Sequence, residues 1–194
     1  MSLSNGASEL RDTQSGPPPV AHDLRGFTGA GYDKGRGLLW QVAWFFISGT
    51  VVVRWWCPPS IRARILRAFG AKIGAGVVIR QGARIHWPWK LEVGDGSWIG
   101  DDAWLLNLEP ITIGRNVCIS QQALLCTGSH DRRSRTFEYD NGPITVEDDV
   151  WIAARATVLR GTVIGRGAVI GATALVTTDI APAALVLAPR SQVR

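Results

Sequence analysis

A repeat of six residues runs through the second half of the chain and constrains its fold more than any other feature. From Ile73 the sequence divides into fifteen hexads in five groups of three, each hexad opening on an aliphatic residue, as in IGAGVV, IRQGAR and IHWPWK. A period of six fits neither the 3.5-residue nor the 3.6-residue period of packed helices. Gly, Asp and Asn recur where turns are needed. The pattern predicts a solenoid whose coil has three flat faces, each a short strand.

This repeat resembles the hexapeptide-repeat acyltransferases, whose coils form a left-handed parallel β-helix. We therefore expect an all-β domain of about five coils over residues 71–181, preceded by one or two helices. Its aliphatic first positions should stack into a buried column, and each coil should pair with the backbone edge of the next. Sugar-nucleotide enzymes, γ-class carbonic anhydrases and serine acetyltransferases share this fold, so the repeat specifies architecture more closely than function.

Three segments flank the repeats. Residues 1–37 are rich in turn formers and predict an N-terminal arm, in which we place no site. Residues 38–70 are apolar and basic: the stretch Leu38–Trp56 predicts one helix, and a second follows Pro58 and Pro59 and ends at Gly70. Residues 182–194 are expected to form a C-terminal tail.

Charge is concentrated near the predicted helices. The section from Lys34 to Lys90 carries ten Lys or Arg residues and no Asp or Glu, although the whole chain has a net charge of only +5. The stretch Leu38–Trp56 is short for a span, but its tryptophans suit a helix lying on an anionic membrane surface. Packing on the domain or on a partner subunit is the alternative. We expect no nucleic-acid partner.

Composition and cysteine content indicate the cellular compartment. The chain has 194 residues, is 46% hydrophobic and 19% charged, and so is not wholly disordered. Its three cysteines are unclustered, and its first residues contain no apolar signal-peptide core. These features predict reduced thiols and a cytoplasmic protein, at the inner face of the membrane if the helical segment binds there. Cys118 and Cys126 are expected to serve packing.

The spacing of the coils identifies one rebuilt corner. Successive triplets begin at Ile73, Val93, Ile113, Val146 and Ile164, so they exceed eighteen residues by 2, 2, 15 and 0. Every addition follows a third hexad. The additions should therefore leave the solenoid at one corner, and the longest, within an inserted loop at 127–145, should open a cleft there.

Two polar residues at this corner are candidate catalytic residues. His130 ends the hexad before the long insertion, and Asn107 lies one coil below the segment that leads to it. Acyl transfer from a thioester to a hydroxyl needs a base near neutral pKa and a donor for the oxyanion, but no covalent enzyme intermediate. We expect His130 to be the base and Asn107 its partner, although Asn107 could instead stabilise the corner.

A metal centre is not expected. A γ-class carbonic anhydrase would need three histidines around zinc. The chain has three in all, with His22 in the arm and His86 two coils below Cys126, which leaves only His130 at the corner.

Further motifs narrow the resemblance. The runs DLRGFTGAGYDKGRGLLWQ, RAFGAKIG, WPWKLEVGD and CTGSHD are similar to those of bacterial exopolysaccharide O-acetyltransferases of the colanic-acid type, near the nodulation-factor, maltose and galactoside acetyltransferases. The resemblance covers about residues 23–194. It implies acetyl-CoA as co-substrate without a metal, a saccharide acceptor such as an exopolysaccharide or lipid-linked glycan precursor, and a homotrimer with acetyl-CoA between neighbouring β-helices.

The same resemblance implies the co-substrate site. Trp151 would form a wall of the acyl site, and the backbone N–H of Ala154 would face the thioester oxygen, although Ala153 stands where relatives have glycine. Gly171 and Ala172 would line the groove. The C-terminus departs from the relatives, with Thr178 for Lys and Leu187 for Gly. The expected phosphate partners are Arg166, Arg190 and Arg194.

Two alternatives stay open. The chain could be a non-catalytic β-helix scaffold, or an acetyltransferase for another small hydroxyl acceptor. Independently of the resemblance, outward-facing Trp98, Trp104 and Trp151 should leave apolar sides that three-fold association would cover.

Overall fold

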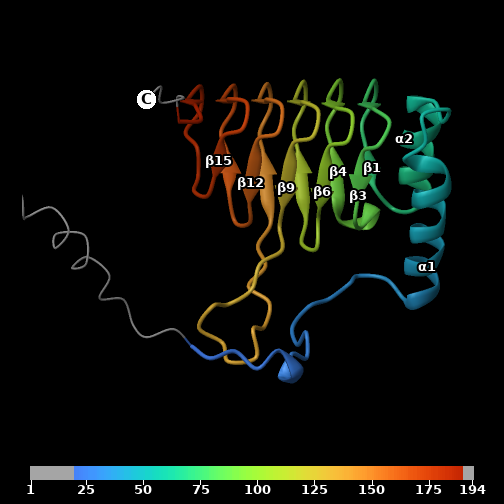
Figure 1. The fold of residues 1–194 in the computed structure, drawn as a ribbon. Coiled ribbons are helices and arrows are strands. Elements are labelled where there is room, and N and C mark those ends of the chain that lie inside the picture. The colour runs from blue at the N-terminus through green and yellow to red at the C-terminus, as the bar shows by residue number, and fades with distance from the viewer. Residues whose placement is uncertain (1–19, 190–194) are drawn as a thin grey trace, which may run out of the picture.

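The computed structural model describes residues 20–189 and shows a solenoid of three parallel sheets with helices at one end (Figure 1). The first sheet contains β1 (Lys72–Ile73), β4 (Leu91–Val93), β7 (Ile111–Ile113), β10 (Ile144–Val146) and β13 (Val163–Ile164). The second contains β2 (Val78–Ile79), β5 (Trp98–Ile99), β8 (Cys118–Ile119), β11 (Trp151–Ile152), β14 (Val169–Ile170) and β16 (Leu185–Val186). The third contains β3 (Arg84–Ile85), β6 (Trp104–Leu106), β9 (Leu124–Cys126), β12 (Thr157–Leu159) and β15 (Leu175–Val176).

The aliphatic first position of each triplet stacks as the repeat predicts. Ile73 pairs with Val93, Val93 with Ile113, Ile113 with Val146 and Val146 with Ile164. All five side chains are buried in one hydrophobic core. Burial of such a column, at about 25 cal/mol per Å² of apolar surface, is the main stabilising term of a stack in which each coil contacts only its neighbours.

The corners bring coils into close contact. At Gly74 a Cβ atom would lie only 2.3 Å from the Asp95 Oδ1 atom and 2.7 Å from the Asp95 backbone nitrogen of the next coil. The Asp95 carboxylate also accepts a hydrogen bond from Ala75 N at 2.7 Å. Glycine at this hexad position therefore permits one corner to rest directly on another.

The solenoid is longer than expected at its C-terminal end. Five complete coils are present, and β16 adds a further strand that pairs with β14. Residues 182–186 of the predicted tail thus continue the repeat, because Leu185 and Val186 stack on Val169 and Ile170.

The short additions lengthen strands of the first sheet instead of forming loops. Leu91, Ile111 and Ile144, which precede the triplet starts by two residues, pair in register and are buried. The additions do lie at one corner, between the third and first sheets. There the fifteen-residue addition leaves the solenoid as a long excursion (Figure 1).

Two helices and a π-helical turn cover the first coil: α1 (Leu38–Ile47), η2 (Ser48–Val52) and α2 (Pro59–Ala68) (Figure 1). Trp44 is buried and donates from Nε1 to the carbonyl of His86 at 2.9 Å. Arg62 is also buried and donates to the carbonyls of Val52, Arg54 and Ile79. The apolar stretch predicted as one helix forms two short elements, α1 and η2. None of the helices within residues 20–189 is both long and apolar enough to cross a bilayer.

Candidate active site

The excursion that begins within the third hexad of coil three is a two-legged hairpin, residues 127–142, which we call the loop hairpin. Asp140 N donates to the Ser129 carbonyl at 2.9 Å, Asp131 N to the Glu138 carbonyl at 2.8 Å, and Gly142 N to the Thr127 carbonyl at 3.0 Å. His130 pairs across the hairpin with Tyr139. His130 thus lies on a leg of the hairpin, outside the stacked coils.

Two aromatic residues of the opposite leg hold the His130 ring. The imidazole stacks on Phe137 at 4.3 Å between centroids and 10° between planes, and on Tyr139 at 5.1 Å and 23°. The Nδ1 atom lies 2.7 Å from the carbonyl oxygen of Phe137. A carbonyl can only accept, so Nδ1 carries the proton, and a neutral imidazole presents Nε2 as its basic atom.

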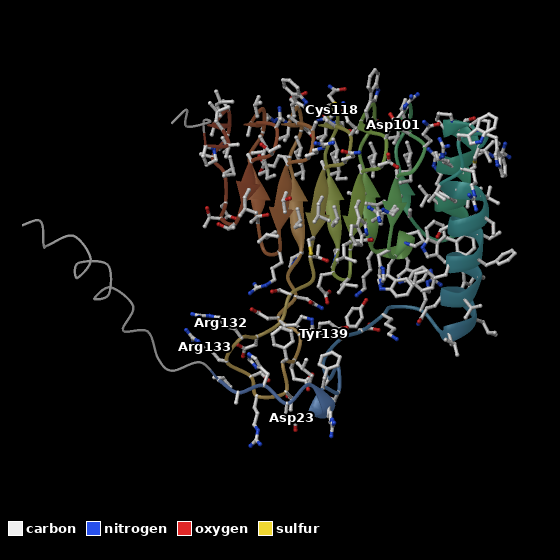
Figure 2. The ribbon with its side chains drawn as sticks, viewed as in Figure 1. Asp23, Asp101, Cys118, Arg132, Arg133 and Tyr139 are labelled. Carbon is white, nitrogen blue, oxygen red and sulfur yellow. The ribbon has the colours of Figure 1, made fainter. Side chains whose placement is uncertain are left out.

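A polar cavity of about 590 Å³ adjoins His130. Its lining includes Tyr139 and, from the hairpin and the coil above, three arginines and two aspartates: Arg132, Arg133, Arg160, Asp131 and Asp140. Arg160 forms an ion pair with Asp140. Figure 2 shows Arg132, Arg133 and Tyr139 on the hairpin. These donors and acceptors suit a hydroxyl-rich ligand.

The sequence suggested Asn107 as a partner of His130, but the hydrogen bonds of the Asn107 side chain go to the backbone of His86 and Trp87. Its side chain is fully buried, and Oδ1 accepts hydrogen bonds from the backbone nitrogens of His86 and Trp87, both at 3.0 Å. Nδ2 donates to the carbonyl of Trp87 at 2.5 Å. The amide therefore joins its own coil to the one below, and this geometry assigns it a structural role because no substrate can reach a buried amide.

Four of the expected co-substrate residues lie together along the second sheet. Trp151 stands on β11 with 49% of its surface exposed, and Ala154 forms the following corner. Ala172 lies at the same corner one coil later, after Gly171, and Thr173 N donates to the Ala154 carbonyl at 3.0 Å. The N–H of Ala154 has no hydrogen-bond partner among residues 20–189, so it is available to an oxyanion.

Of the three arginines expected to contact the phosphates of coenzyme A, one lies within the described residues. Arg166 is exposed and shares the Asp148 carboxylate with Arg115, at 2.9 Å and 3.1 Å respectively. It lies at the corner between the first and second sheets, across the second sheet from Ala154. The expected phosphate partners Arg190 and Arg194 lie outside the described residues.

A single chain does not bring His130 to Ala154. The loop hairpin leaves the corner between the third and first sheets, whereas Ala154 occupies the corner between the second and third sheets. The full width of the third sheet separates these corners. The candidate base and the candidate oxyanion donor would therefore come together only across two chains.

The N-terminal segment contributes aromatic neighbours of the loop hairpin that no sequence pattern indicates. Phe27 lies edge-on to His130 at 5.7 Å and to Tyr139 at 5.2 Å between centroids. His22 lies beside Phe137, with its Nδ1 3.0 Å from the Ser134 carbonyl. Within residues 20–189 no three His, Cys, Asp or Glu side chains are grouped to bind a metal ion.

The comparisons with known proteins fit this architecture. The model of the bacterial transferase hexapeptide (six repeats) family matches residues 143–178. WcaF of Escherichia coli strain K12, provisionally named a colanic acid biosynthesis acetyltransferase, is 43% identical over 154 residues, which are 77% of this chain and 83% of that protein. The chain belongs to the hexapeptide-repeat acetyltransferase family. The resemblance predicted from the motifs is thereby confirmed.

Two further matches of this hexapeptide-repeat acetyltransferase have lower sequence identity. A galactoside O-acetyltransferase of Lactococcus lactis is 29% identical over 127 residues, 63% of this chain and 61% of that protein. The crystal structure of a hexapeptide-repeat acetyltransferase from Vibrio cholerae matches with a TM-score of 0.69 at 25% identity, covering 76% of this chain and 84% of the other. The expected β-helical fold and acyltransferase class are both confirmed.

Proposed function

We propose that the protein transfers an acetyl group from acetyl-CoA to a hydroxyl of a saccharide, with His130 as general base. The observation that carries this proposal is the oriented imidazole of a residue that lines the polar cavity: its Nδ1 is bound to the Phe137 carbonyl at 2.7 Å, and Nε2 has no hydrogen-bond partner among residues 20–189. Relatives named for colanic acid biosynthesis and for galactoside O-acetylation support a saccharide acceptor.

Acetyl transfer from a thioester to a hydroxyl needs a general base and a hydrogen-bond donor for the oxyanion. His130 Nε2 would remove the hydroxyl proton while the acceptor oxygen bonds to the thioester carbonyl carbon. The C–S bond would then break, and the imidazolium would return its proton to the leaving thiolate. The N–H of Ala154 fits the role of donor to the oxyanion between these steps, because it has no partner among the described residues.

We propose a homotrimer as the active form. An exposed apolar column runs along the second sheet, in which Trp98 is 59% exposed, Trp151 49% and Leu185 63%. A neighbouring chain covering this side would remove the column from water and could bring its His130 to the Trp151 and Ala154 of the first chain. Gly171 and Ala172 would then leave room for coenzyme A, with Arg166 available to a phosphate.

Turnover assays test the function directly. With acetyl-CoA and a panel of oligosaccharides and lipid-linked glycans, at least one saccharide should release free CoA in equal amount to acetylated product. Coenzyme A at 100 times its Kd should stabilise the protein by about 2.7 kcal/mol and so raise its Tm. Light scattering on the same preparation should give the mass of three chains. A monomer without a CoA-induced shift would contradict the proposal and favour a non-catalytic scaffold.

We also propose that the helical cap contacts an anionic membrane. The cap face, formed by α1 and the residues after η2, exposes large apolar side chains: Leu38, Leu39, Trp40, Val42, Phe45, Phe46, Trp55 and Trp56. Arg54 and Arg64 of the helical segment are also exposed, and no acidic residue occurs between Lys34 and Lys90. Apolar burial and cationic attraction act together at a bilayer surface.

Vesicle flotation tests this contact. The full chain should float with vesicles containing phosphatidylglycerol and bind phosphatidylcholine vesicles more weakly. A triple variant, Leu39→Ser with Phe46→Ser and Trp55→Ser, should lose most of the flotation, because these side chains are 86%, 67% and 79% exposed. Leu24→Ser is the matched control, since Leu24 is 64% exposed outside the cap. If the full chain ignores anionic vesicles at moderate salt, the cap face serves packing between chains.

A further inference from the structure

The N-terminal strap, residues 20–36, packs on the loop hairpin, and the hydrogen-bonded residues of the two segments are more than 100 positions apart in sequence. Asp23 N donates to the Arg135 carbonyl at 2.8 Å. At Gly26 a Cβ atom would lie 2.8 Å from the Thr136 Cγ2 atom, so the strap backbone lies close against the Thr136 side chain there. Figure 2 shows Asp23 on the strap beneath the hairpin that carries Tyr139.

One carboxylate gathers three donors from the strap. Glu138 Oε1 accepts from the backbone nitrogen of Thr28 at 3.0 Å and from its hydroxyl at 3.1 Å, and Oε2 accepts from the nitrogen of Gly29 at 3.1 Å. The bond from the Thr28 backbone, with the others, lowers the pKa of the Glu138 carboxyl. Glu138 is therefore ionised at neutral pH and can accept all three bonds.

The neighbours of Glu138 are the residues that hold the base. Phe137 supplies the carbonyl bound to His130 Nδ1 and the closest stacked ring, and Tyr139 supplies the second stacked ring. From the strap, Phe27 closes the cluster edge-on to His130. The aliphatic column of the solenoid does not extend into the hairpin, so its legs depend on these contacts for their geometry.

We propose that Glu138 is a positioning residue that orients the His130 imidazole by binding the strap at Thr28 and Gly29. The inference rests on the proposed role of His130 as base. Anchoring Glu138 restricts the backbone on either side of it, and this keeps the Phe137 carbonyl and both stacked rings in place. Small displacements of a base from its productive position lower catalytic rates, so an anchor outside the cavity affects turnover.

Kinetics give the first test. Glu138→Ala should lower kcat by about 10- to 100-fold while leaving KM for acetyl-CoA within about twofold, because the loss is one of orientation. Glu138→Gln should lie between Ala and wild type: its amide oxygen can still accept from Thr28, but its NH₂ group would face the N–H of Gly29. Leu24→Ala is the control on the strap, since its side chain is exposed, and it should match wild type.

Imidazole ¹⁵N NMR of the full chain gives the second test, and the chain has only three histidines to assign. At a pH where the ring is neutral, wild-type His130 should appear as the Nδ1–H tautomer. Glu138→Ala should shift its two nitrogens toward the average of both tautomers, whereas a merely structural role would leave them unchanged. A Glu138→Ala protein with control-level kcat and an unchanged His130 spectrum would overturn the proposal.

The two tests also separate this inference from the proposed function. If His130→Ala stays active, His130 is not the base, yet the tautomer shift in Glu138→Ala would still demonstrate that Glu138 orients the ring. If His130→Ala is inactive but neither kcat nor the spectrum responds to Glu138→Ala, the base assignment stands and the positioning role is refuted.

Discussion

Replacing His130 with alanine should lower kcat by about 10²- to 10⁴-fold, the usual contribution of a positioned general base. Among residues 20–189 the imidazole is the only histidine ring lining the cavity, and its Nδ1 is engaged with the Phe137 carbonyl, which leaves Nε2 to remove a proton. The fold should be unaffected, because His130 lies on the hairpin and outside the aliphatic column.

The measurement is turnover of purified protein with a saccharide acceptor at saturating acetyl-CoA. Tm, trimer mass and CoA affinity should stay near wild type, since the proposed CoA contacts lie along the second sheet. Arg135→Ala is a matched control, because its exposed side chain is on the same hairpin tip and the substitution keeps the backbone carbonyl that accepts from Asp23 N of the strap. Retention by His130→Ala of more than about a tenth of wild-type kcat would mean that another group is the base.

Asn107→Ala should destabilise the fold by about 2–4 kcal/mol, with little effect on kcat of the folded enzyme. The substitution removes both acceptor bonds to the backbone of His86 and Trp87 and the donor bond to the Trp87 carbonyl, all at a buried corner. Buried polar groups left without partners each cost about 1–3 kcal/mol. The backbone nitrogen of His86 also reaches the Leu105 carbonyl at 3.1 Å, which offsets part of the loss.

Urea unfolding measures this change, and assays well below the lowered Tm measure kcat. Thr112→Ala, on the exposed face of a neighbouring coil, should alter stability by about 0.5 kcal/mol or less. The reverse pattern, in which Asn107→Ala keeps its stability but loses ten- to a hundredfold in kcat, would restore the catalytic partnership that the sequence suggested.

The repeat itself could be predicted from the sequence down to individual residues. Ile73, Val93, Ile113, Val146 and Ile164 were expected to stack, and they do so in register. The excursion does leave the solenoid at the corner that the additions predict, whereas His130, expected at the end of the hexad before it, lies on a leg of the hairpin. These features are local and periodic. Because a coil contacts only its neighbours, the pattern of one eighteen-residue coil already shows which side chains pack inward.

The environment of His130 was decided by tertiary structure. The strap meets the hairpin through residues about 110 positions apart, such as Thr28 and Glu138, and no period links them. Asn107 is a polar residue at the predicted corner, but its amide bonds to the backbone of the coil below. The repeat pattern does not specify whether such a side chain faces that backbone or the hairpin. The C-terminal strand β16 was missed because its hexad lacks the usual glycine and charged corner residues.

The sequence by itself determined the solenoid, its core column, the rebuilt corner and the candidate base. It could do so because contacts between neighbouring coils repeat at a fixed residue spacing. Only the tertiary structure decided what orients that base. The stacked rings of Phe137 and Tyr139, the edge of Phe27 and the Glu138 anchor depend on the course of two non-repeating segments. Such segments find each other through side-chain chemistry in three dimensions, and their pairing has no signature along the chain.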